Sequence, residues 1–142
     1  MNQSSKDYLT KNEIKLFTNQ NKNLKFLDFV DNPLLRHHND HSIFLVPSNY
    51  GEGLPRGILE AISLEIPVIA SKKACVGLFD NKTLFMASNN NKESYLKEIE
   101  KISIKKKEGK LNQFLSNAKE QVLNKFSDSL VVEKTLELYR SF

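Results

Sequence analysis

A buried strand, a helix and a second strand in succession form the feature that most restricts the fold of this chain. Residues 42–46 read Ser-Ile-Phe-Leu-Val, a short apolar block that predicts a strand buried on both faces. Pro55 suits the first turn of a helix, because its missing N–H costs no hydrogen bond there, and Pro67 ends that helix. Residues 67–71 then read Pro-Val-Ile-Ala-Ser, which predicts a second strand. This order predicts an α/β fold with a parallel sheet.

Two glutamates, Glu52 and Glu60, lie eight positions apart across the start of this helix. Gly51 and Gly53 flank Glu52 and let the chain turn sharply and approach a ligand. The free N–H groups and the positive end of the helix dipole favour a diphosphate near Glu52. Glu60 lies roughly 10 Å further along the helix axis, where it can accept hydrogen bonds from ribose hydroxyls. The pattern therefore suits a nucleotide-sugar.

Residues 47–61 resemble the retaining glycosyltransferases of the GT-B fold, in glycosyltransferase family 4, also called glycosyl transferases group 1. The shared pattern is the E-x7-E motif, embedded in a strand ending in Pro-Ser, then Glu-Gly-Leu-Pro-Arg and Leu-Glu-Ala. The resemblance implies that Glu52 faces the donor sugar as the catalytic residue and that Glu60 binds the ribose. The alternative is that Glu52 caps the helix and Glu60 is a solvated helix residue. The donor-binding residues implied by the resemblance are Gly51, Glu52, Gly53, Leu54, Arg56 and Glu60.

The resemblance extends along most of the chain. Residues 24–30 look like the preceding strand of the family, residues 33–38 like a short helix, and residues 82–87 like the last strand. Apolar residues at helical spacing follow in the tail. The expected fold is an incomplete Rossmann-like parallel sheet of about four strands with helices, the later part of a GT-B C-terminal domain. Residues 1–22 are expected to form an N-terminal helical, polar segment, and residues 23–142 the partial nucleotide-sugar-binding domain.

A length of 142 residues corresponds to one domain, whereas GT-B enzymes consist of two. The resemblance implies that the acceptor domain is absent, together with two strands whose loops carry the Arg and Lys that neutralise the donor diphosphate. In the strand order 3-2-1-4-5-6 these strands would lie between residues 24–30 and 42–48, so an apolar edge is left bare. We therefore expect activity only with a companion polypeptide, or self-association through the edge. The alternatives are a truncated or decayed non-catalytic fragment, and a scaffold or membrane-contacting module that keeps the fold.

The segment after the second strand departs from the family pattern. The family has a Gly-Gly or Gly-Cys loop there, whereas residues 71–77 read Ser-Lys-Lys-Ala-Cys-Val-Gly. A side chain in place of the glycine hinders close approach of the diphosphate. Cys75 has no base nearby in the sequence, which favours a small, partly buried residue over a nucleophile.

The net charge of +4 includes one basic run, Lys105–Lys107. A solvated helix end that complements the dipole explains this run, and weak attraction to an anionic membrane surface is the alternative. Nucleic-acid binding is not expected, because no aromatic residues interleave the run. His37, His38 and His41 lack a fourth ligand, so no metal is expected, and the only small molecule implied is the nucleotide-sugar substrate. The single cysteine and the polar N-terminus indicate the cytoplasm. If the basic run attracts anionic lipid, the protein is expected to make peripheral contact with the inner face of the membrane.

Overall fold

The computed structural model describes residues 10–27, 30–50, 53, 55–75 and 78–141. Contacts within the chain divide it into two units, Met1–Pro33 and Leu34–Phe142. In the first unit, helix α1 spans Lys11–Gln20. It begins with a capping box, in which the Glu13 carboxylate accepts from the Thr10 backbone N–H at 2.7 Å and the Thr10 hydroxyl accepts from the Glu13 N–H at 3.3 Å. None of the residues of α1 is buried.

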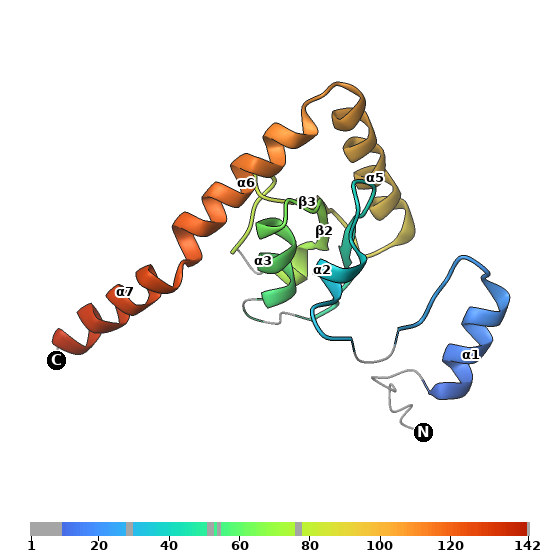
Figure 1. Cartoon of the computed structure of the whole chain (residues 1–142), viewed down its shortest axis with the longest axis horizontal. Helices are drawn as coiled ribbons and strands as arrows, with labels where there is room; N and C mark the ends of the chain where they lie inside the picture. The colour runs from blue at the N-terminus through green and yellow to red at the C-terminus, as the bar shows by residue number, and fades with distance from the viewer. Residues whose placement is uncertain (1–9, 28–29, 51–52, 54, 76–77, 142) are drawn as a thin grey trace. The chain divides into compact units, whose positions relative to one another are not determined.

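The second unit contains a parallel sheet (Figure 1). Its strands are β1 (Phe44–Val46), β2 (Val68–Ser71) and β3 (Phe85–Ala87), in the order β1-β2-β3. Leu45 pairs with Ile69, and Ile69 in turn with Phe85, so β2 is the central strand. The predicted α/β fold with a partial Rossmann-like parallel sheet is therefore confirmed.

Helices connect and follow these strands. Pro33–His37 forms α2 before β1, and Arg56–Ser63 forms α3 between β1 and β2, close to the predicted helix. Lys72–Cys75 forms the short helix α4 directly after β2. Three longer helices follow β3: α5 (Lys92–Lys107), α6 (Leu111–Phe126) and α7 (Asp128–Arg140).

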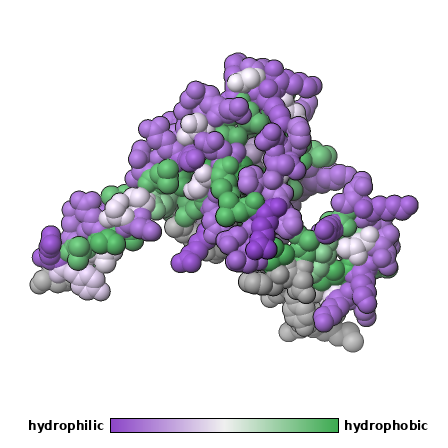
Figure 2. All heavy atoms as spheres, viewed as in Figure 1, coloured by the Kyte–Doolittle hydropathy of each residue, from purple (hydrophilic) through white to green (hydrophobic). Residues whose placement is uncertain are grey.

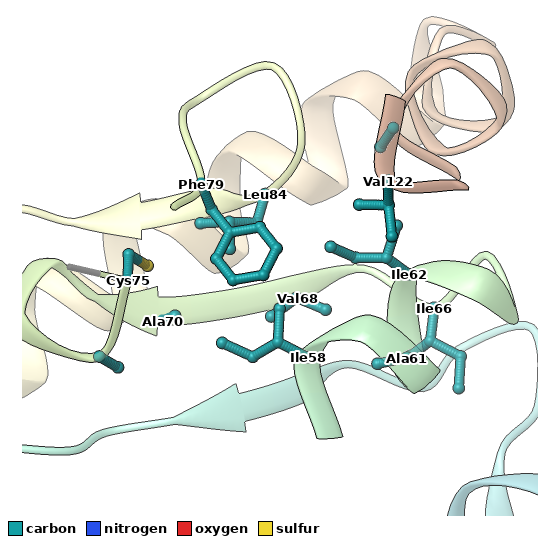
Figure 3. Packing of buried hydrophobic residues seen from close by; sticks show 12 residues of the cluster. Ile58, Ala61, Ile62, Ile66, Val68, Ala70, Cys75, Phe79, Leu84 and Val122 are labelled. Carbon is teal, nitrogen blue, oxygen red and sulfur yellow. The ribbon is translucent and has the colours of Figure 1, made fainter. Parts of the chain in front are cut away.

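Two groups of buried side chains cover the two faces of the sheet. On one face, Ile58 and Ile62 of α3 pack with Val68 of β2 and with Val122 of α6 (Figure 3). On the other face, Ile69 and residues of β3 pack with Ile102 of α5 and with the first part of α6. Because side chains alternate along a strand, neighbouring residues of β2 belong to opposite groups. All four residues of β2 are buried.

The structure differs from the prediction of about four strands. Residues 24–27 and residue 30 lie outside any strand, while residues 28 and 29 are outside the described residues. Leu24 and Phe26 are about half exposed. A strand without a neighbour cannot satisfy its backbone hydrogen bonds, and the described residues form no strand that could lie between this segment and β1, as the family order requires. The sheet formed by the described residues therefore has three strands.

The prediction that the first strand is buried on both faces is also wrong. Phe44 and Val46 pack against the group of buried residues that includes α3, but Leu45 is 48% exposed. On the Leu45 face, α5 contacts β2 and β3. The outer strand β1 is therefore packed against a helix on one face only.

The last helix, α7, has no buried residue. Hydrophobic side chains come to the surface along it (Figure 2), among them Val131, Val132 and Leu136. Ser127 caps its start by accepting a hydrogen bond from the Leu130 N–H at 3.4 Å. Across the described residues, no helix has both the length and the apolar character that a membrane span requires.

Candidate functional site

The loops that follow the three strands meet at one edge of the sheet, because parallel strands end on the same side. A cavity of about 450 Å³ lies at this edge. Open α/β sheets bind ligands outside the carboxyl ends of their strands, and this volume lies within the range of ligand sites, ~300–1,000 Å³. Its lining comes from the loops after all three strands: Asn49, Ser71, Lys72, Lys73, Ala87, Ser88, Asn89 and Asn90.

Hydrogen bonds of Asn90 connect the loop after β3 to the loop after β1. The Asn90 side-chain amide donates to Asn49 Oδ1 at 2.6 Å and to the Pro47 carbonyl at 3.3 Å. The Tyr95 hydroxyl, from α5, donates to Asn90 Oδ1 at 2.6 Å. Burial raises the pKa of the Tyr95 hydroxyl, so the phenol remains protonated as a donor at neutral pH. This network holds the loop after β1 in position.

Ser71 provides a second connection at the same edge. Its side chain is 2% exposed, donates to the Ser48 carbonyl at 2.5 Å and accepts from the Ala74 N–H at 3.1 Å. It therefore ties the end of β2 to the loop after β1 and starts α4 at the same time. A single buried hydroxyl group thus bonds to the loop after β1 and to the backbone of α4.

The structure describes three of the six predicted donor-binding residues; Gly51, Glu52 and Leu54 lie outside the described residues. Gly53 is exposed and has a φ of +69°, where a side chain would be strained although a Cβ would meet no atom within 4 Å. Arg56 is the exposed first residue of α3. Glu60 is exposed on the same helix, and its carboxylate has no hydrogen bond or ion pair with another described residue.

The packing of α3 determines where Glu60 can point. Ile58, Ala61 and Ile62 are buried, so the helix face that carries Glu60 is turned away from the core. Gly57 lets α3 lie close to β1, because a Cβ there would be only 3.2 Å from the Phe44 ring. Since α3 follows β1, its amino end begins at the edge where the cavity lies.

The described residues of the predicted motif are not among the residues that line the cavity. Gly53, Arg56 and Glu60 do not line the cavity, whereas Asn49, Ser88, Asn89 and Asn90 do and were not predicted as site residues. The sequence signal for the second set is the run of Ser-Asn-Asn-Asn at residues 88–91, directly after a strand. The structure thus adds a cavity at the edge of the sheet where the helix that carries Glu60 begins.

Cys75 lies in α4 near Ala70 and is 1% exposed (Figure 3). Burial raises the pKa of its thiol, which is the opposite of the shift that activates a nucleophilic cysteine. Cys75 is therefore a packing residue that anchors α4.

We expect a thiol reagent to modify native Cys75 at pH 8 on the order of a hundredfold or more slowly than the urea-unfolded chain, because reaction requires local opening and thiolate formation. Absorbance of the released chromophore measures both rates, and free cysteine under both conditions corrects for the effect of urea. A native rate close to the unfolded rate would contradict the buried position.

Within the described part of the chain, the three histidines do not lie in a cluster with acidic or sulfur ligands. Among the described residues, no group of three or more His, Cys, Asp and Glu side chains could hold a metal ion. His38 Nδ1 lies 2.6 Å from the Leu34 carbonyl, and His41 Nδ1 lies 3.0 Å from Lys106 Nζ. An ammonium beside His41 Nδ1 is an unfavourable neighbour for a metal cation.

Two lysines of the basic run make contacts within the chain. Lys105 Nζ lies 5.3 Å from the centre of the Phe114 ring, and Lys106 Nζ donates to the Asp40 carbonyl at 2.7 Å. The run occupies the last turn of α5, where cations complement the helix dipole. Contact with a membrane surface remains a prediction.

This geometry defines a partial Rossmann-like domain with a cavity at the carboxyl ends of its strands. The family model for glycosyl transferases group 1 matches residues 4–104, and the chain belongs to this family. The capsular polysaccharide biosynthesis glycosyltransferase CapM of Staphylococcus aureus is 27% identical over 130 residues, which cover 89% of this chain and 33% of that relative. The chain thus spans about a third of the length of this curated relative. No solved structure gives a significant match.

Proposed function

We propose that this chain binds the nucleotide-sugar donor of a glycosyl transfer reaction, and that catalysis requires further parts of such an enzyme. The observation that carries the proposal is that the E-x7-E stretch follows β1 in the sequence and ends at Glu60 within α3, in a member of the glycosyl transferases group 1. Ligands of open α/β sheets bind at this edge. The printed name of the relative, a glycosyltransferase of capsular polysaccharide biosynthesis, agrees with this chemistry.

In the proposed complex, Glu60 binds the ribose. Its carboxylate is exposed on α3 and has no partner among the described residues, so both oxygens are available to accept hydrogen bonds from vicinal hydroxyls. Glu60 lies four residues after Arg56, the first residue of the helix, or ~6 Å along its axis. This distance is about the length of a diphosphate linkage. A donor with its ribose at Glu60 would therefore place its sugar near the amino end of α3.

The amino end of α3 is the proposed position of the diphosphate and the sugar. The first N–H groups of a helix lack intrahelical acceptors, and Pro55 before α3 offers no capping side chain. These N–H groups and the helix dipole would offset the negative charge that develops on the leaving diphosphate. Gly51, Gly53 and Leu54 would approach the donor through their backbone, and Glu52 would face the sugar as the catalytic residue. Transfer with retention of configuration follows from the resemblance and is part of the proposal.

Parts outside this chain complete the proposed enzyme. The match covers 33% of the relative, so about two thirds of the relative's sequence has no counterpart in this chain. Within the described residues, β1 is paired on one side only, and Leu45 on it is half exposed. A companion segment or polypeptide that supplies the acceptor domain would also have an open strand edge to add to. A second copy of the chain at this edge is the alternative.

Calorimetric titration of the chain with UDP, GDP and ADP tests donor binding, with uridine, guanosine and adenosine as matched ligands. We expect one of the three diphosphates to bind, and the corresponding nucleoside to bind more weakly because it lacks the charged group. Circular dichroism before each titration verifies the fold. A folded chain that binds none of the three diphosphates would contradict the proposal.

A further inference from the structure

Lys72 and Lys73 form a cationic side of the cavity at the carboxyl ends of the strands. We propose that these two lysines bind the diphosphate of the nucleotide donor, an assignment that rests on the proposed function. Residues 71–77 read Ser-Lys-Lys-Ala-Cys-Val-Gly, where the resemblance implies a Gly-Gly or Gly-Cys loop. Ala74 takes the place of the glycine, and the two lysines directly before it add two positive charges at the same edge.

The charge of the cavity favours an anion. Lys72 and Lys73 line it, and no acidic residue lines it among the described residues. Both lysines are exposed, and neither has an ion pair or side-chain hydrogen bond within the described part of the chain. Lys101 and Lys119, in contrast, pair with Glu98 and Glu65. Both charges at the cavity are therefore available to a ligand.

Packing fixes the segment that carries the two lysines. Ser71, just before them, is buried and bonded to the Ser48 carbonyl and the Ala74 N–H. Ala74 and Cys75, just after them, are 0% and 1% exposed. With both sides anchored, the backbone of α4 stays at the cavity and only the lysine side chains need to be ordered by the ligand. Less conformational entropy is lost than if the whole loop had to be ordered.

The other lining residues include polar groups that a charged ligand can use. Asn49, Ser88 and Asn89 contribute amide and hydroxyl groups that can donate to phosphate oxygens. Lysine binds phosphate as a compact charge with three donors and needs no fixed orientation of the ligand. A diphosphate carries enough negative charge to interact with both ammonium groups at once.

The double variant K72Q/K73Q tests this assignment, because it removes both charges while retaining polar side chains. Both positions are exposed, so we expect an intact fold. The control is K97Q/K134Q, which removes two exposed lysines that do not line this cavity. The probes are UDP, GDP, ADP and inorganic pyrophosphate, each titrated at low and at high salt.

We expect K72Q/K73Q to bind the preferred nucleoside diphosphate about tenfold or more weakly, since two charge-assisted contacts are lost. The control and the charge-preserving K72R/K73R should bind like the original chain. Salt should weaken binding less in K72Q/K73Q, because fewer charges take part. Pyrophosphate binding that depends on the same lysines would support the anion site even if no nucleotide bound and the proposed function failed.

Two results would overturn the assignment. If K72Q/K73Q and the original chain bind the nucleotide with equal affinity, the proposed function stands and the phosphate lies elsewhere. If the original chain binds neither pyrophosphate nor any nucleotide, the assignment and the proposed function both fail.

Discussion

Replacing Ile69 with alanine is expected to lower the free energy of unfolding by about 2–5 kcal/mol, the largest stability effect of any single change considered. Ile69 is 0% exposed in the central strand and packs with residues of β3, α5 and α6. The substitution removes apolar contacts and leaves a cavity that neighbours on three elements cannot all fill. Single domains are typically stable by only about 5–15 kcal/mol, so this loss should be easily measured.

Leu45→Ala is the matched control, because Leu45 pairs with Ile69 in the neighbouring strand but is 48% exposed. Its loss should cost less than about 1 kcal/mol, as half of the side chain is already in water. Urea unfolding followed by circular dichroism gives both values. Equal losses for the two variants would contradict the placement of Ile69 at the centre of the core.

Replacing Glu60 with glutamine is expected to weaken nucleoside diphosphate binding by about tenfold to a hundredfold. Hydrogen bonds to a charged acceptor contribute about 1.5–3 kcal/mol each, and glutamine retains the shape but loses the charge and one acceptor. Because Glu60 is exposed and has no partner among the described residues, the fold should be unaffected. Calorimetric titration of both chains with the preferred nucleotide measures the difference.

The control for this change is Glu100→Gln, an exposed glutamate on α5 that does not line the cavity at the carboxyl ends of the strands. It should bind the nucleotide as the original chain does. If Glu60→Gln binds equally well, Glu60 is a solvated helix residue, which is the alternative that its sequence position left open. Loss of binding by both variants would instead indicate a nonspecific effect of net charge.

The helices and most of the sheet could be predicted because their signals are local. Pro55 and Pro67 bracket α3, and β2 is a short run of Val, Ile and Ala that needs no periodicity to be recognised as buried. The strand expected at residues 24–30 has an equally apolar composition, yet its described residues form none. Strand formation requires a neighbour, and composition alone does not reveal whether that neighbour is present.

The exposed face of β1 was missed for a related reason. The run of residues 42–46 predicts burial on both faces, which holds for a strand inside a fully covered sheet. Leu45 lies at an edge that α5 does not cover, and coverage depends on elements about 50 residues later in the chain. The outer position of β1 could not be inferred from its own residues.

The residues of the candidate site also fall into two groups, those that the sequence predicted and those that it did not. The motif residues on and before α3 were found because the E-x7-E pattern is contiguous. Asn49, Asn90 and Tyr95 were not, because the bond between the two asparagines joins residues 41 positions apart, and a Ser-Asn-Asn-Asn run alone looks like an ordinary turn. Only the parallel order of the strands brings these loops to one edge.

Amide chemical shifts of the isotopically labelled chain, recorded during titration with the preferred nucleoside diphosphate, test the central claim most directly. Donor binding at the carboxyl edge predicts that the largest shifts fall on Gly53, Arg56 and Gly57 at the start of α3, and on Lys72 and Lys73. Shifts confined to the opposite end of the strands or to α7, in a folded chain, would contradict the claim.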